Sequence, residues 1–299
     1  MGINTGYLLT AVLGAVWTAI AIIVSEGRRR DCPTPQFYFV GSLLAVLILT
    51  CLAGADGLRS IFAAESRLAV CCFFVGSLFN GAGQAISMMN LSRGGRALAY
   101  AIPQQGFLLP YLWSIAFWGQ HVSVLSVAGM GLIVAAVLYL SMTRSGDRSA
   151  SLSAGRIAVA LSAMLLLGTS QIVIITPTRF AAGSSLPLLP SACVILGANT
   201  LFFLVWSLIR PRGFAAFRFY LPLGAGWGVC AAASYCLLLS ALGILGKIGQ
   251  SGIVFAVGAG ILILLYSLFT IFSYREKLNW RRKCAFAALV CGICLVKLG

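Results

Sequence analysis

Polar side chains inside otherwise apolar stretches are the residues of this chain best suited to chemistry. Asn80, Gln84 and Ser87 are spaced i, i+4 and i+7, so a helix would present all three on one face. Lipid tails offer such groups no hydrogen-bond partner, so they must face protein or water. Hydrogen bonds between neighbouring helices, worth about 0.6 kcal/mol each, are the alternative explanation for any single polar residue. For this three-residue stripe we favour the wall of a polar cavity.

Other polar and aromatic residues are candidates to line the same cavity. Gln104 and Gln105 follow Pro103, which removes a helical hydrogen bond and favours a kink. The remaining candidates lie on other apolar stretches: Trp17, Gln171, Tyr235, Gln250 and Ser251. Further polar residues of these stretches are Thr169, Ser170, Asn199, Thr200 and Ser234. Hydrogen bonding between helices stays open as the alternative for each polar residue.

Two basic residues occupy equivalent places, before the fourth and the ninth apolar stretch. Arg96 and Lys247 each follow a short link that contains glycine. Because the N-terminus of a helix attracts anions, a cation beside it would help to hold a carboxylate or a phosphate. A basic residue that anchors the helix end at the membrane interface explains the same pattern, and both interpretations stay open.

Acidic residues are scarce, which narrows the possible functions. The chain has six Asp and Glu and a single His, and none of the acids lies in the middle of an apolar stretch. Glu26 is expected to pair with Arg28–Arg30 beside it. Cationic drugs are disfavoured, because a buried cation needs an anionic partner. A catalytic centre needs a nucleophile with a base, paired carboxylates or a metal, so we predict no enzyme, no metal and no cofactor.

These residues belong to an alternation of long charge-free stretches and short basic loops. Hydrophobic residues make up 60% of the chain and charged residues 9%, against about 25% charged residues in a soluble domain. A helix that crosses the hydrocarbon core needs about 20 apolar residues. We therefore predict an all-α polytopic membrane protein with ten transmembrane helices, at residues 5–25, 36–53, 68–90, 97–117, 122–142, 156–177, 187–209, 220–242, 248–272 and 281–298.

The positive charge is spread over loops rather than gathered in one patch. A net charge of +15 in one patch would suggest nucleic-acid binding. Most of the 21 lysines and arginines instead follow odd-numbered spans, and the positive-inside rule assigns those loops to the cytoplasm. We therefore expect an integral protein of a bacterial inner membrane with both termini outside the cytoplasm. Its expected partners are the lipid bilayer and a small-molecule substrate, without nucleic acid, and its expected state is a monomer or homodimer.

The chain divides into two halves of five predicted spans each. Residues 1–143 form the first half, 144–155 a polar linker, and 156–299 the second half. Since five is odd, the second half must enter the membrane from the opposite side, which gives the inverted repeat of many secondary transporters. At an offset of 151 residues, Gln84 corresponds to Tyr235 and Arg96 to Lys247, in support of a duplication.

The end of the chain carries a resemblance to a known family. Residues 274–280 are YREKLNW and lead into an apolar last span. This end is similar to that of drug/metabolite transporter superfamily proteins of the ten-helix EamA type, in which a short G-E-x-L-type link precedes the last helix of each half. The first half departs from that pattern, with Gln120 and His121 where the family has an acidic residue. The family generally has cytosolic termini, in contrast to the charge pattern of this chain.

Together these features lead to a functional expectation. The resemblance implies transport of small metabolites, and the lack of buried acids favours a neutral, zwitterionic or anionic one, such as an amino acid. We expect a secondary transporter that works by alternating access. A sugar or phosphorylated-metabolite transporter of the same superfamily is one alternative, and a non-transporting membrane subunit is another.

Overall fold

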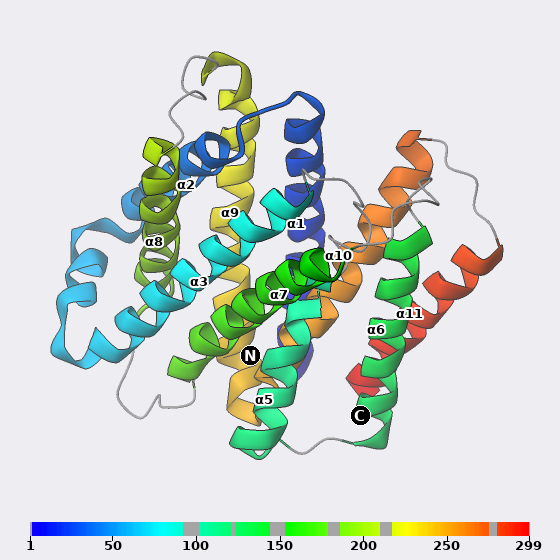
Figure 1. The fold of residues 1–299 in the computed structure, drawn as a ribbon. Helices are drawn as coiled ribbons and strands as arrows, with labels where there is room; N and C mark the ends of the chain where they lie inside the picture. Colours follow the sequence, from blue (N-terminus) through cyan, green and yellow to red (C-terminus); the bar gives the residue numbers. More distant parts are fainter. Residues whose placement is uncertain are drawn as a thin grey trace.

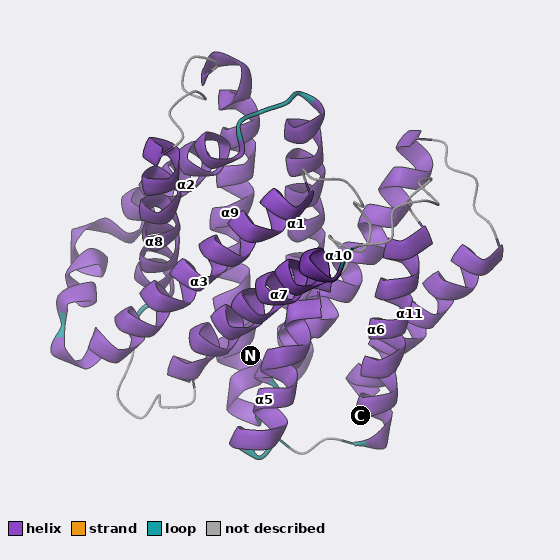
Figure 2. Ribbon diagram, viewed as in Figure 1, coloured by secondary structure: helices purple, strands orange, loops and turns teal. Residues whose placement is uncertain are grey.

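The computed structural model describes residues 2–91, 102–103, 105–120, 123–143, 153–178, 186–209, 217–274 and 280–298. Within these ranges the regular structure is helical, and no strand occurs there (Figure 1, Figure 2). Helices dominate because a backbone surrounded by lipid must satisfy its own hydrogen bonds.

The helices follow the predicted spans closely. In chain order they are α1 (Ile3–Arg29), α2 (Thr34–Arg59), α3 (Arg67–Leu91), α5 (Leu108–Trp118), α6 (Val124–Thr143), α7 (Ala154–Ile175), α8 (Leu188–Ile209), α9 (Phe217–Leu245), α10 (Ser251–Tyr274) and α11 (Trp280–Leu298). The predicted fourth span, 97–117, is described in part: it contains the 3-10 turn η3 (Gln105–Phe107) and most of α5.

Seven helical segments of the described chain are long and apolar enough to cross a membrane, which makes this a polytopic α-helical membrane fold. They are Ile3–Arg29, Thr34–Phe62, Ala64–Asn90, Ala154–Thr178, Leu188–Ile209, Tyr220–Ile248 and Ser251–Phe269. The apolar part of α6, Val124–Leu140, is shorter. α5 has 11 residues, too few for a full span. α11 has 19 residues but begins with Arg281, Arg282 and Lys283, so it is less apolar than the seven segments.

Helices that are far apart in the sequence lie side by side. α1 packs on α9 and α10, α2 on α8 and α9, and α3 on α7 and α8. α5 packs on α7 and α10, and α6 pairs with α11 at the right of Figure 1. Each of these contacts joins a helix of residues 2–143 to a helix of residues 153–298. The two halves of the chain are therefore interleaved.

Glycines allow the closest of these helix crossings. A methyl group added to Gly14 of α1 would lie 2.9 Å from the carbonyl oxygen of Gly258 on α10. One added to Gly168 of α7 would lie 2.7 Å from the carbonyl oxygen of Gly106 in η3. Neither crossing has room for a side chain. Membrane helices pack through small residues in this way because lipid provides no hydrophobic force between helices.

Three clusters of buried apolar side chains fill the interior. The largest is built mainly by α1, α5, α6, α9, α10 and α11, the second by α2, α8 and α9, and the third by α3, α7 and α8. The ring of Tyr235 on α9 packs against all three clusters. Tyr235 therefore marks the point where the clusters meet.

Candidate functional site

The hydroxyl of Tyr235 is the centre of a small polar group inside this apolar interior. Its oxygen accepts a hydrogen bond from Nδ2 of Asn80 on α3, at 3.4 Å, and another from Nδ2 of Asn199 on α8, at 3.5 Å. Both bonds are long and therefore weak. We call Asn80, Asn199 and Tyr235 the central triad. Because α3 comes from the first half of the chain and α8 and α9 from the second, the triad forms only when the halves come together.

A close crossing of α3 and α8 brings the two asparagines to this point. A methyl group added to Gly81 of α3 would lie 2.7 Å from the ring of Phe202 on α8, so the helices touch there. Asn80 precedes Gly81, and Asn199 lies about one turn before Phe202. Asn199 is 2% exposed, and its Oδ1 has no hydrogen-bond partner among the described residues. One amide oxygen of the triad is thus unsatisfied.

Two glutamines, one in η3 and one on α7, have buried amide atoms near the crossing of these two elements. Gln105 is 5% exposed, and neither its Oε1 nor its Nε2 has a partner among the residues described. Oε1 of Gln171 on α7 lacks one as well. Gly106, which follows Gln105, touches Gly168 of α7, one turn before Gln171. Both glutamines, each a candidate site residue from the sequence, therefore lie beside the same crossing.

Two hydroxyl groups lie where α5 crosses the start of α10. Tyr111 and Ser251 are both buried, and within the described chain neither hydroxyl has a hydrogen-bond partner. A methyl group on Gly252, next to Ser251, would lie 3.0 Å from Cα of Tyr111, so the helices are in close contact here. Ser251 was a predicted site residue. Tyr111 was missed: Tyr235 was selected with the help of its correspondence to Gln84, whereas a lone tyrosine between apolar neighbours resembles a residue of the core.

The three residues of the predicted stripe on α3 differ in burial and in contacts. Asn80 joins the central triad, Gln84 is half-buried, and Ser87 is 5% exposed. Trp17 of α1 is half-buried and packs over Gly258 of α10, at the side of the largest apolar cluster. Arg96 and Gln104 lie outside the described residues.

Lys247 does not open a helix, in contrast to the prediction. It lies in η6 (Gly246–Ile248), the 3-10 turn that follows α9, and its side chain is exposed. Gly249 then takes a φ of +77°, a conformation that favours glycine, and α10 begins at Ser251. Lys247 therefore lies three residues before the α10 N-terminal segment begins at Gln250–Ser251, in a separate turn.

At one end of α1, Tyr7 contacts the beginning of α10. Its hydroxyl donates a hydrogen bond to Oε1 of Gln250, a predicted site residue, at 3.0 Å. The ammonium of Lys297 lies 5.9 Å from the centre of the Tyr7 ring, within the range of a cation–π interaction. Gly6 packs against the side chain of Leu245 at the end of α9. We call this region the Tyr7 end.

The other end of α1 lies beside a second polar contact, between α3 and α7. Arg156 donates from Nε to Oδ1 of Asn90 at 3.3 Å and from Nη2 to the Asn90 carbonyl at 3.0 Å. Nδ2 of Asn90 donates back to the Arg156 carbonyl at 3.2 Å. We call these three bonds the Arg156 clasp. Arg28 near the end of α1 donates to Sδ of Met88 on α3, so the clasp is about 30 Å along α1 from Tyr7.

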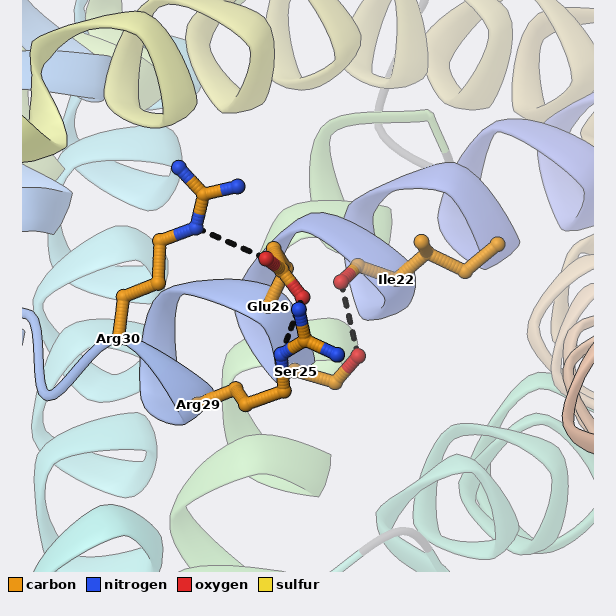
Figure 3. Close-up of polar contacts among 5 residues, drawn as sticks. All are labelled: Ile22, Ser25, Glu26, Arg29 and Arg30. Carbon is orange, nitrogen blue, oxygen red and sulfur yellow. Dashed lines mark hydrogen bonds and ion pairs between the residues drawn. The ribbon is translucent and has the colours of Figure 1, made fainter. Parts of the chain in front are cut away.

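Acid–base pairs lie at the same end of α1 and at the end of α2, where Arg59 pairs with Asp56 at 3.2 Å. Glu26 accepts hydrogen bonds from Nε of Arg30 at 2.8 Å and from Nε of Arg29 at 3.2 Å (Figure 3). This confirms the expected pairing of Glu26 with the neighbouring arginines. The carboxylate is engaged at the helix end and does not face the central triad.

No family model matches the chain, and no curated protein sequence matches it.

The fold has solved relatives. Among 21 matching chains is a structure described as "Crystal structure of protein", with a TM-score of 0.74 over 99% of this chain and 97% of that chain. The sequences are 15% identical, so the likeness establishes the fold alone. Because it covers nearly all of both chains, it includes the helices that carry the central triad, the Tyr7 end and the Arg156 clasp.

The chemistry of the central residues is that of neutral hydrogen bonding. Among the described residues, no group of three or more His, Cys, Asp or Glu is placed to hold a metal ion. Cys291 and Cys294 are exposed on α11. The interior offers amides, which donate and accept, and hydroxyls, which do both. Such groups bind and orient a polar molecule but do not exchange protons readily near neutral pH.

Proposed function

We propose that this protein is a secondary transporter of the drug/metabolite superfamily, of the ten-helix EamA type. It moves a small neutral, zwitterionic or anionic metabolite across a bacterial inner membrane by alternating access, with both termini outside the cytoplasm. The substrate binds at the central triad together with Gln105 and Gln171. The last span of the first half is α6, and the last span of the second half is α11. The fourth span of the first half includes α5.

The observation that carries this proposal is the unsatisfied polar interior. Asn199, Gln105 and Gln171 each have an amide oxygen that is buried without a partner among the described residues. A buried polar atom without a hydrogen bond costs about 1–3 kcal/mol, and most such atoms in proteins are paired. A binding site explains their presence, because a ligand or water supplies the partners in another conformation.

The helix contacts support a relation between the two halves. In the proposed repeat, each helix of the first half has a counterpart in the second half: α1 and α7, α2 and α8, α3 and α9, α5 and α10, and α6 and α11. Each helix of a contact can be replaced by its counterpart. The α3–α7 contact then becomes α9–α1, α2–α9 becomes α8–α3, and α1–α10 becomes α7–α5, all of which occur. The contacts α2–α8, α5–α10 and α6–α11 are unchanged. An inverted repeat, with its site between the halves, accounts for this pattern.

Alternating access requires contacts between the halves on both sides of the site. The Arg156 clasp joins α3 to α7, and the bond from Tyr7 to Gln250 joins α1 to α10. Each contact joins one half of the chain to the other, and the two lie at opposite ends of α1. Their alternate release would open the site first to one side of the membrane and then to the other.

Uptake into liposomes tests the proposal. Purified protein is reconstituted, and uptake of labelled amino acids, sugars, carboxylates, phosphorylated metabolites and quaternary cations is compared with that of protein-free liposomes. We expect saturable uptake of at least one neutral, zwitterionic or anionic class. Uptake restricted to quaternary cations would refute the substrate assignment. Absence of uptake for every class would favour the non-transporting membrane subunit.

Tyr235→Phe tests the position of the site. This change keeps the ring but removes the oxygen that accepts from both asparagines, so two amide donors, one buried and one half-buried, lose their partner. We expect about tenfold weaker apparent substrate affinity, which corresponds to about 1.4 kcal/mol. Tyr139→Phe on α6 is the matched control, since α6 packs on α11 and not on α3 or α8. Equal transport by both variants would place the site elsewhere.

A further inference from the structure

We infer that the central site binds an uncharged ligand rich in hydroxyl groups, such as a sugar or polyol, in preference to an amino acid or an anion. This inference rests on the proposed transport function and selects one substrate class for the same site. It starts from the buried polar residues of the described chain, all of which are Ser, Thr, Asn or Gln. No Asp, Glu, Lys, Arg or His among the described residues is buried.

The absence of a buried ion in the described interior decides against a charged ligand. A charge taken out of water needs a partner of opposite sign, or it binds at a large energetic penalty. Of the two basic residues expected from the sequence to hold an anion, the structure describes Lys247. This residue is exposed and lies at the end of α9. Glu26, near the end of α1, is paired with Arg29 and Arg30. The central residues thus offer no counter-charge to a carboxylate, a phosphate or an ammonium group.

The unsatisfied atoms show which groups the ligand must carry. Gln105 has both an acceptor and a donor without a partner in the described chain, and Gln171 and Asn199 each have an acceptor. Tyr111 adds a hydroxyl, which donates and accepts. A ligand that satisfies this set must donate at least three hydrogen bonds and accept at least one. Several hydroxyl groups on a compact molecule meet that requirement without a net charge.

The positions of these residues are consistent with one site. Gln105 and Gln171 flank the crossing of η3 with α7, where Gly106 touches Gly168. Ile174 and Ile175, about one turn beyond Gln171, belong to two of the apolar clusters against which Tyr235 packs. Gly76 of α3 packs against Ile174 of α7 and Gly83 against Leu167, so Gln171 lies at about the level of Asn80, between these two contacts. A ligand among them would contact both halves of the chain.

In this conformation the unsatisfied atoms are covered by protein, so the ligand enters when the halves separate. The closed, empty protein is then destabilised by these atoms, and an occupied site removes that penalty. The same argument predicts an unusual property of a mutant. Leu has a similar size to Gln, so Gln105→Leu removes two buried polar atoms that lack partners. The variant should therefore be more stable than the wild type without ligand, and it should bind the ligand more weakly.

A matched series of ligands tests this inference. Thermal unfolding of the detergent-purified full chain is measured with glucose, sorbitol, ribose and mannose, and with gluconate, glucosamine, glucose 6-phosphate and glutamine at the same concentrations. We expect an upward shift of the midpoint with at least one neutral compound and a smaller shift, or none, with each charged one. A shift with the charged compounds alone, or no shift with any neutral compound, overturns the inference.

Variants and uptake then separate this inference from the transport proposal. Gln105→Leu and Gln171→Leu should raise the midpoint of the empty protein and abolish the shift produced by the active neutral compound. Ser162→Ala is the control, since Ser162 is exposed on α7 and its hydroxyl bonds within its own helix. A lower midpoint with an intact ligand shift would assign the glutamines a structural role. Liposome uptake of a charged compound alone would overturn the ligand class but leave the transporter proposal intact.

Discussion

The two ends of α1 lie beside contacts of very different strength. At the Arg156 clasp, a guanidinium donates twice to Asn90 and the Asn90 amide donates back, while Asn90 is 3% exposed. At the Tyr7 end, one neutral hydrogen bond joins Tyr7 to Gln250, beside an apolar contact of Gly6 with Leu245. Hydrogen bonds of charged groups contribute about 1.5–3 kcal/mol and neutral ones about 0.5–1.5 kcal/mol. The Arg156 clasp is therefore the harder contact to open.

This difference suggests a direction for the proposed cycle. The Arg156 clasp lies on the basic side of the molecule, with Arg28–Arg30 at the same end of α1. By the positive-inside rule we propose that this side faces the cytoplasm. A protein closed more firmly on the cytoplasmic side would, without substrate, open more often at the Tyr7 end. The predictions below compare the two ends directly.

Arg156→Leu is expected to have the largest effect. It removes both guanidinium donors to the buried Asn90, at the side-chain Oδ1 and at the main-chain carbonyl, while the bond from Asn90 Nδ2 to the main-chain carbonyl of residue 156 remains. The free energy of unfolding should therefore fall by about 2–3 kcal/mol. The measurement is thermal or denaturant unfolding in detergent. Arg156→Lys is the matched control, because it keeps the charge but cannot donate from two nitrogens in a fixed plane, and it should lose part of this amount. An unchanged midpoint for Arg156→Leu would mean that the clasp does not hold the helices together.

Much of the fold follows from the sequence, because it depends on short-range patterns. The long apolar stretches became helices, and the breaks between them contain Gly, Pro or charged residues. Asn80 and Tyr235 were both selected because each is polar within an apolar stretch. Their contact was not predicted. Helical periodicity shows which face a residue occupies, but not which helix, from the other half of the chain, will pack against that face.

The residues that the sequence missed or misplaced have local explanations. Tyr7 and Tyr111 resemble interfacial or core aromatics, since tyrosine is common in both settings. Arg156 stood at the edge of a predicted span and looked like one of many basic loop residues. Lys247 was misplaced because a glycine with positive φ, Gly249, separates it from α10, and a sequence does not reveal φ. Each error concerns a helix end, where several conformations satisfy the same residues.

Tyr7→Phe is expected to have a smaller effect than Arg156→Leu. It removes the hydroxyl that donates to Gln250 but keeps the ring beneath Lys297. Gln250 is half-buried, so water can replace part of the lost bond, and the free energy of unfolding should fall by about 0.5–1 kcal/mol. The same unfolding assay measures it. A loss as large as that of Arg156→Leu would break the comparison, since the two ends would then be equally strong.

The smallest expected effect concerns Lys297 and separates the two contributions at the Tyr7 end. Lys297→Met keeps most of the side-chain length but removes the charge above the Tyr7 ring, and exposed cation–π pairs contribute about 0.5–1 kcal/mol. A double-mutant cycle with Tyr7→Leu, which removes the ring, isolates this term. A cycle of Lys297→Met with Tyr7→Phe is the control. The ring remains in Tyr7→Phe, so Lys297→Met should lower the free energy of unfolding as much in this variant as in the wild type. A coupling of about 0.5 kcal/mol with Tyr7→Leu is expected, and zero coupling would leave the hydrogen bond to Gln250 as the polar contact that holds this end closed.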